Sequence, residues 1–184
     1  MATVILVRHG RTTANASGIL AGRTPGVQLD QVGIDQAART ADRLAAVPLA
    51  ALVSSPLERC RQTADIILSR QSGEVPFDVD EAITEADYGD WQGGVLGELM
   101  KDPLWSAVQR HPSGVTFPGG EPMARMRERA VAAIRRRDAA MKDEHAVWAA
   151  VSHADIIKSI IADALGMPFD HFQRIAVAPA SLSV

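Results

Sequence analysis

The chain has 184 residues, of which 47% are hydrophobic and 22% charged, with a formal net charge of -3. These values predict one globular domain spanning residues 1–184, and the slight negative charge excludes general electrostatic binding to nucleic acid or to an anionic membrane. The single cysteine, Cys60, excludes an internal disulfide. The sequence shows neither a signal-peptide pattern nor an apolar segment long enough to span a bilayer, so we expect a cytoplasmic protein.

The first predicted element is a buried strand that ends on polar residues. Residues Thr3 to Val7 form a near-continuous apolar run, and Arg8, His9 and Gly10 follow it directly. Such a run is typical of a central strand in a parallel sheet, because helices cover both faces of that sheet. Open α/β proteins bind ligands at the carboxyl ends of such strands, so we expect Arg8 and His9 to lie at a functional site.

A helix and a second strand come next. Residues 33–47 carry apolar side chains at helical spacing, and Pro48 ends that helix. The run LAALVSSP at residues 49–56 predicts a short strand. Ser55 occupies the position expected of an N-cap and Pro56 the first helical position, so we predict a helix over Pro56–Ser69.

The middle of the chain alternates loops and helices. The acidic, glycine-rich stretch at residues 82–94 predicts a loop, and short helices are expected near residues 95–100 and 104–109. Prolines and glycines predict a second loop at residues 112–120. Apolar side chains recur on one face of residues 121–143, which predicts a long amphipathic helix packed on the core.

The last third of the chain repeats the opening pattern. Residues 146–151 predict a strand, after which Ser152 and His153 lead into a helix that stops at Gly166. The final segment, RIAVAPASLSV, predicts an edge strand. Three buried strands thus end in VRHG, VSSP and VSHAD. We therefore predict an α/β fold whose parallel strands bring these polar residues to one edge of the sheet.

The residue types at this edge favour phosphoryl transfer. A neutral imidazole is a competent nucleophile near neutral pH, and guanidinium groups bind phosphate oxygens in bidentate fashion. Arg8 precedes His9, and Arg59 falls in the first turn of the predicted second helix, whose start adds partial positive charge. We therefore expect a phosphohistidine on His9, with the two arginines holding the phosphoryl group.

Five motifs carry a resemblance to a known family. They are VRHGRTTAN, SSPLERCRQTA, ITEADYGDWQGG, FPGGE and VSHADI, and they resemble in order and spacing those of the histidine phosphatase superfamily, also called the phosphoglycerate mutase-like family. The resemblance covers nearly the whole chain. It implies a three-layer α/β/α sandwich with a mostly parallel central sheet, and a two-step mechanism that needs no metal ion or other cofactor.

The same resemblance implies roles for individual residues. His9 resembles the family's nucleophile, His153 the second histidine that stabilises the transferring group, and Glu85 the proton donor. Ala154 stands where the family commonly has glycine; its methyl group is tolerable in helical backbone but would otherwise narrow the phosphate pocket. The residues that resemble phosphate or substrate ligands are Arg8, Arg59, Asn15 and Arg23.

The proton-donor role places a physical demand on Glu85. An alkoxide leaving group needs a proton, so the acid must stay protonated near neutral pH, which requires burial or a nearby phosphate dianion to raise its pKa. Asp87, Asp90 and Asp155 are alternative carboxylates, because sequence alone does not rank their burial. In the second half-reaction the same group, as a carboxylate, would activate water.

Two alternatives use the same residues differently. A metal ion could be surrounded by His9, His153, Asp155 and Glu85, but two arginines in the same place would repel it, and the sequence has no HxH or HExxH spacing. A non-catalytic module that binds a phosphorylated ligand is the second alternative. The presence of the whole set of catalytic residue types argues against that reading.

A phosphatase and a phosphoglycerate mutase-type phosphomutase would share the phosphohistidine. A mutase must also retain a bisphosphorylated intermediate, which calls for extra basic residues near the acid. Residues 82–102 contain one basic residue, Lys101, and several acids, which favours a phosphatase. We expect its substrate to be a small-molecule phosphomonoester such as a sugar phosphate, bound in a pocket shaped by residues 14–28 and 89–120. We expect no nucleic-acid or membrane partner; the oligomeric state, a homodimer included, stays open.

Overall fold

The computed structural model describes residues 2–184 and contains one five-stranded sheet in the order β3-β2-β4-β1-β5. The first four strands pair in parallel, and β5 pairs with β1 in the antiparallel direction. The predicted mostly parallel sheet is therefore confirmed. The strands are β1 (Thr3–Arg8), β2 (Ala51–Ser54), β3 (Phe77–Val79), β4 (Val147–Ser152) and β5 (Leu182–Ser183).

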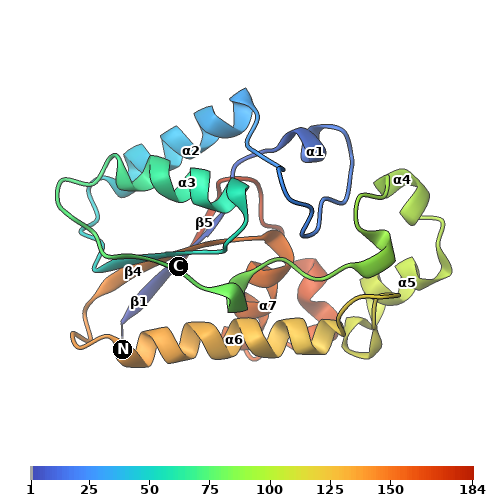
Figure 1. Cartoon of the computed structure of the whole chain (residues 1–184). Coiled ribbons are helices and arrows are strands. Elements are labelled where there is room, and N and C mark those ends of the chain that lie inside the picture. The colour runs from blue at the N-terminus through green and yellow to red at the C-terminus, as the bar shows by residue number, and fades with distance from the viewer. Residues whose placement is uncertain (1) are drawn as a thin grey trace.

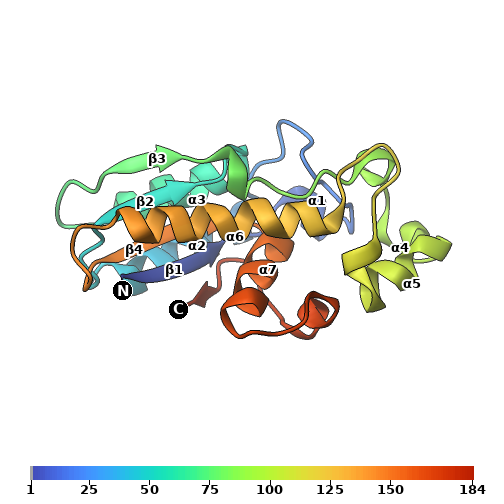
Figure 2. The ribbon, with the colours of Figure 1, turned by 90° about the horizontal axis from the view of Figure 1, so that it is seen from below.

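Helices cover both faces of this sheet, as the apolar strands require. One layer consists of α2 (Gln31–Leu44) and α3 (Glu58–Leu68), which lie above the sheet in Figure 1. The other consists of α6 (Met123–Ala140) and α7 (Ala154–Ala164); Figure 2, seen from below, shows α6 lying along the sheet with α7 beside it. The molecule is thus a three-layer α/β/α sandwich.

The alternation of side chains along the central strands explains their continuous apolar sequence. In β1, Ile5 and Val7 pack in the cluster formed with α2 and α3, whereas Leu6 packs in the cluster on the other face. In β4, Trp148 and Ala150 face the α6 and α7 layer. Because both faces are buried, neither strand has a solvent side on which polar residues could alternate.

The start of α3 differs from the prediction. We expected Ser55 to cap a helix beginning at Pro56, but α3 begins at Glu58, with Leu57 at the N-cap and no side-chain hydrogen bond there. The Ser55 hydroxyl instead lies 2.8 Å from Nε2 of His153. The Ser55 hydroxyl therefore contacts a residue that is distant in sequence, whereas local sequence rules would place it at the N-cap of the helix.

Other boundaries shift by a few residues, and some short elements were missed. Helix α2 begins at Gln31 rather than residue 33, because the Asp30 side chain accepts a hydrogen bond from the Gly33 amide and so caps the helix. The sequence analysis did not predict β3 or the four-residue α1 (Thr13–Ala16). Both are too short to carry a periodic signal.

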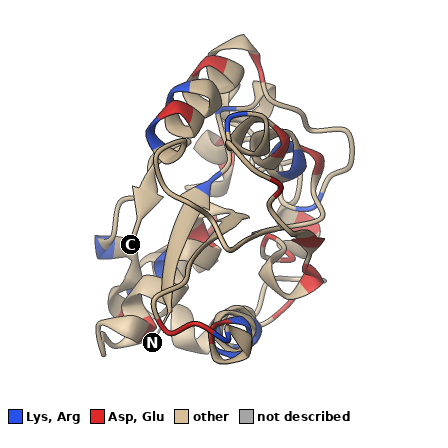
Figure 3. Ribbon diagram, turned by 90° about the vertical axis from the view of Figure 1, so that its left-hand side faces the viewer, with Lys and Arg blue, Asp and Glu red and all other residues tan. Residues whose placement is uncertain are grey.

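Short helical segments gather beyond the carboxyl ends of the strands. Helices α4 (Leu96–Leu99) and α5 (Pro103–Arg110) lie at the right of Figure 1, on the same side as α1. At the opposite end of the molecule, which faces the viewer in Figure 3, both basic and acidic residues lie along the helices. Within residues 2–184, no helix is both long and apolar enough to cross a membrane.

Candidate active site

A cavity of about 560 Å³ opens at the carboxyl ends of the central strands, where Arg8, His9, Arg59 and Glu85 contribute to its wall. Strand pairing explains the meeting of the two histidines. Arg8 pairs with Ser152 in the register of β1 and β4, so the next residues, His9 and His153, lie side by side. Their ring centroids are 5.3 Å apart. The convergence predicted from the strand ends is therefore confirmed.

His9 is oriented by its own backbone neighbour. Its Nδ1 lies 2.7 Å from the Gly10 carbonyl oxygen, and since a carbonyl only accepts, Nδ1 carries the proton. Nε2 therefore keeps its lone pair. Burial, with the positive charge of Arg59 as the next cause, lowers the pKa of His9 to about 3, so the ring is neutral over the physiological range. A ring in this state can act as a nucleophile without first losing a proton.

Two guanidinium groups present unused donors beside this ring. Arg8 donates through Nη1 to the Val177 carbonyl at 2.6 Å, and Arg59 donates through Nη2 to the Gly22 carbonyl at 2.7 Å. Among the described residues, Nε of Arg8 and Nη1 of Arg59 are buried without a hydrogen-bond partner. Unsatisfied buried donors are costly, so a site that keeps two of them on cationic groups is built for an anion.

His153 is fully buried at the first turn of α7. Nη2 of Arg59 lies 3.2 Å from its Nδ1; because arginine can only donate, Nδ1 accepts and Nε2 carries the proton. That Nε2–H points at the hydroxyl of Ser55, 2.8 Å away. Burial, followed by the charge of Arg59, holds the pKa of His153 well below its usual value. Both histidines are thus neutral while the cavity is free.

Glu85 has the properties expected of a general acid. Its Oε1 accepts a hydrogen bond from the Ala86 amide at 3.0 Å, and its Oε2 lies 3.8 Å from Nδ1 of His153. Burial, and then the nearby negative charge of Asp155, raise the pKa of Glu85 to about 7. At neutral pH a large fraction of the group therefore holds a proton, without any bound phosphate.

The structure separates Glu85 from the alternative carboxylates. Asp87 and Asp90 do not line the cavity. Asp155 does, but its Oδ2 accepts from the Tyr88 hydroxyl at 3.0 Å and its Oδ1 lies 3.3 Å from Nζ of Lys158. Both oxygens of Asp155 are engaged, which leaves Glu85 as the carboxyl group beside the histidines.

The loop that carries Glu85 is held by residues that sequence reasoning missed. Arg129 on α6 donates to the carbonyls of Ala82, Thr84 and Glu85. Glu121, the last residue of the FPGGE motif, accepts from Arg129 at 2.6 Å. The glutamate in that motif could have pointed to an ion pair, but nothing in the sequence names its partner.

The remaining predicted ligands fall in different places. Asn15 lines the cavity, although its Oδ1 already accepts from the Thr12 amide within the cap of α1. Arg23 is not among the cavity residues, and its guanidinium binds the Glu85 carbonyl and the Glu121 carboxylate. Ala154 lines the cavity as the first residue of α7, where the helical backbone accommodates its methyl group.

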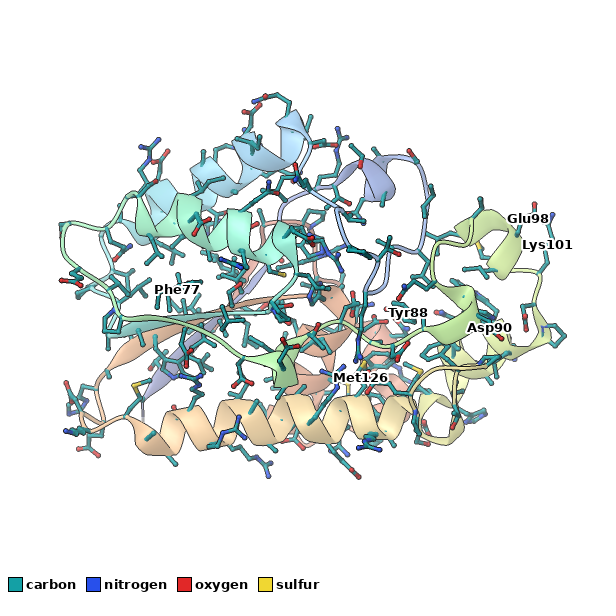
Figure 4. All side chains as sticks on the ribbon, viewed as in Figure 1. Phe77, Tyr88, Asp90, Glu98, Lys101 and Met126 are labelled. Atoms are coloured by element: carbon teal, nitrogen blue, oxygen red, sulfur yellow. The ribbon has the colours of Figure 1, made fainter. Side chains whose placement is uncertain are left out.

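Aromatic side chains form a second part of the cavity wall. Tyr88, Trp91, Trp105 and Phe117 all line it. Figure 4 shows Tyr88 inside the molecule, while Glu98 and Lys101 lie together at the outer tip of α4. Within residues 2–184, no group of three or more His, Cys, Asp or Glu side chains is arranged to hold a metal ion.

Comparisons with known proteins agree with this geometry. The chain is 32% identical over 163 residues to phosphoglycerate mutase-like protein 4 of Arabidopsis thaliana, covering 86% of this chain and 69% of that protein. It is 27% identical to adenosylcobalamin/alpha-ribazole phosphatase of Escherichia coli, covering 91% of this chain and 83% of that protein. The chain spans 36% and 49% of the lengths of two other curated relatives.

A solved structure and a family model complete the comparison. The structure of Bacillus stearothermophilus YhfR superposes with a TM-score of 0.90 at 26% identity, covering 99% of this chain and 89% of that one. The model of the histidine phosphatase superfamily, branch 1, matches residues 4–184. The match includes every strand end described above. The chain therefore belongs to branch 1 of the histidine phosphatase superfamily.

Proposed function

We propose that the protein is a metal-independent phosphatase that hydrolyses a small-molecule phosphomonoester through a phosphohistidine on His9. One observation carries the proposal. A neutral imidazole with a free Nε2 lone pair lies beside two buried arginines, each of which has an N–H group without a partner. These unused donors suit the equatorial oxygens of a phosphoryl group during its transfer.

In the first step, Nε2 of His9 forms a bond to phosphorus as the bond from phosphorus to the ester oxygen breaks. Glu85 gives its proton to that oxygen, so the product leaves as an alcohol rather than as an alkoxide. The pKa of about 7 makes this donation available at neutral pH. Arg8 and Arg59 hold the phosphoryl oxygens throughout.

In the second step, a water oxygen attacks phosphorus and its proton passes to the Glu85 carboxylate. The bond between phosphorus and Nε2 breaks, the electron pair returns to the ring, and inorganic phosphate is released. The two steps restore His9 to its neutral form and Glu85 to its acid form. No other group has to gain or lose a proton.

The charges on the cavity wall favour hydrolysis over the mutase reaction. We call Arg8, His9, Arg59 and Glu85 the phosphoryl-binding group. The other charged residues that line the cavity are Asp155 and Lys158, which pair with each other at 3.3 Å. A mutase substrate carries a carboxylate and, as the intermediate, a second phosphate, and among residues 2–184 the cavity lining offers no unpaired cation for either beyond Arg8 and Arg59, which hold the transferred phosphoryl group. Curated relatives carry both mutase-like and phosphatase names.

The test is phosphate release from a panel of phosphomonoesters in the presence of EDTA. In parallel, 3-phosphoglycerate with catalytic 2,3-bisphosphoglycerate is assayed for isomerisation. We expect phosphate release without isomerisation. Isomerisation without net release would establish the mutase instead, and loss of release in EDTA would overturn the metal-independent mechanism.

A further inference from the structure

The cavity continues well past the phosphoryl-binding group into an apolar chamber. Its walls include Leu20, Trp91, Leu96, Trp105, Phe117 and Ile175. They come from the loop after α1, from the segment around α4 and α5, and from the segment before β5. A volume of about 560 Å³ is that of a small-molecule pocket rather than of a site for a phosphoryl group alone.

The aromatic wall of this chamber is preformed. Trp91 stacks on Trp105 with centroids 6.0 Å apart, and Phe117 packs against Trp91 at 5.5 Å. Tyr88 meets Phe117 edge to face at 5.0 Å. Since each ring is held by the next, the wall can receive a flat or branched apolar group with little reorganisation.

Four polar side chains of the chamber are engaged with one another. Lys158 lies 2.9 Å from the Gln173 amide oxygen and 3.3 Å from Asp155, while Asp155 accepts from Tyr88. Gln109 also lines the cavity and can serve a single ligand hydroxyl, but a ring with several hydroxyls would have to break contacts among these four side chains or leave hydroxyls unsatisfied. A hydrocarbon surface carries no such cost, because it only displaces water from apolar walls.

We propose that this chamber selects phosphomonoesters whose leaving alcohol is an uncharged, mainly hydrophobic or aromatic body rather than a polyhydroxylated sugar. The proposal rests on the phosphatase function above and replaces the expected sugar phosphate with a different substrate class. The chamber contacts the leaving group equally in the ground state and in the transition state. Its selectivity should therefore show mainly in KM.

Two esters of similar shape provide the test. Cyclohexylmethyl phosphate and glucose 6-phosphate both place a primary phosphate ester on a six-membered ring, but only the sugar carries ring hydroxyls. We expect kcat/KM to favour the cyclohexyl ester by roughly 100-fold, which is the discrimination that unmatched polar groups produce. Equal values, or a preference for glucose 6-phosphate, would overturn the chamber assignment and leave the phosphatase intact.

A binding measurement separates failure of the chamber from failure of the reaction. Calorimetry would compare 2-cyclohexylethylphosphonate, which cannot be hydrolysed, with methylphosphonate. We expect the ring to tighten binding by about 100-fold or more, since it buries several methylene groups. Absence of turnover with this gain would refute the proposed reaction only, whereas equal affinities would refute the chamber.

Variants on one helix tie the preference to the wall. Trp105→Ala should reduce the ratio of the two kcat/KM values by about 10-fold, mainly through KM, and Trp105→Phe should restore part of it. Leu104→Ala is the matched control, because Leu104 lies next to Trp105 on α5 and packs on the core without lining the cavity. An unchanged ratio in Trp105→Ala, or an equal change in Leu104→Ala, would contradict the assignment.

Discussion

The two ends of the cavity are built in different ways. The phosphoryl-binding end takes its residues from the end of β1, the start of α3 and the loop that carries Glu85, with His153 buried behind them, and its main side chains are charged or titratable. The apolar chamber takes most of its residues from short helices and loops between residues 89 and 120, and its walls are hydrocarbon. The first end has buried donors without partners, whereas none of the buried atoms that lack a partner among the described residues belongs to the chamber.

This difference separates chemistry from selectivity. Groups at strand ends are fixed by the register of the sheet, which no single loop can alter, so the reacting atoms keep their positions. The chamber is formed by segments that can change in sequence and length without disturbing the sheet. Changes at the first end should abolish turnover of every ester, and changes at the second should re-rank the esters.

The largest effect is expected at the nucleophile. His9→Ala removes the atom that receives the phosphoryl group, so kcat should fall by about 10⁴-fold or more on all esters, apolar and polar alike. Phosphate release and circular dichroism measure activity and fold. His145→Ala, at an exposed position before β4, is the control and should be fully active. Activity of His9→Ala within tenfold of the parent would end the phosphohistidine mechanism.

Glu85→Gln should separate esters by leaving group rather than by shape. Without its proton, alkyl esters should slow by roughly 10²- to 10⁴-fold, while p-nitrophenyl phosphate, whose leaving group needs little protonation, should lose less than about tenfold. Initial rates on both esters measure the difference. Glu81→Gln, on the exposed side of the preceding 3-10 turn, is the matched control. Equal losses on the two esters would remove Glu85 from the acid role.

The pH dependence of kcat/KM should also test the role of Glu85 as the acid. Because the pKa of Glu85 is raised to about 7, kcat/KM for an alkyl ester should fall about tenfold per unit as the pH rises above that value. His9, with a pKa of about 3, adds no limb in this range. Asp155→Asn removes a charge that raises the pKa of Glu85, so the limb should move to lower pH. A limb unchanged by Glu85→Gln would belong to another group.

The smallest effect concerns stability at the two ends. A Cβ on Gly33 would lie 1.9 Å from the Arg11 carbonyl oxygen, in the tight backbone contact behind His9. Gly33→Ala should therefore cost about 1–3 kcal/mol in the free energy of unfolding, measured with urea. Gly97, in α4, has open space around it, so Gly97→Ala should be neutral or slightly stabilising. Similar changes in the free energy of unfolding for the two variants would mean that the two sites tolerate an added methyl group equally well.

The sequence predicted the phosphoryl-binding end far better than the chamber. Arg8, His9 and His153 follow buried apolar runs, and the parallel pairing of those runs is enough to bring them together. Glu85 came from a motif match, and its burial was not readable from the chain. The chamber was predicted only as a pocket shaped by residues 14–28 and 89–120, because the contacts between Trp91, Trp105 and Phe117 join loops whose conformation no periodic pattern determines.

The missed contacts have a common cause. Ser55 reads as a helix cap, and Arg129 reads as one more charge on an amphipathic helix. Their partners, His153 and the carbonyls of the Glu85 loop, are distant in sequence. Local rules assign such side chains to local roles, and tertiary packing decides otherwise.

Ser55 also allows the His153 ring to stay hydrogen-bonded at Nε2 in either of its neutral tautomers. In the free protein, His153 accepts from Arg59 at Nδ1 and donates from Nε2 to the Ser55 hydroxyl. A phosphoryl oxygen held by Arg59 would need a donor at Nδ1, and a hydroxyl can donate as readily as it accepts. Ser55 therefore stabilises the neutral ring in either tautomer, because its hydroxyl accepts from Nε2 in one and donates to Nε2 in the other. A bound phosphate dianion raises the pKa of Glu85, so binding takes up protons, whereas in Glu85→Gln the heat of binding the inorganic phosphate dianion should be the same in buffers of different ionisation enthalpy.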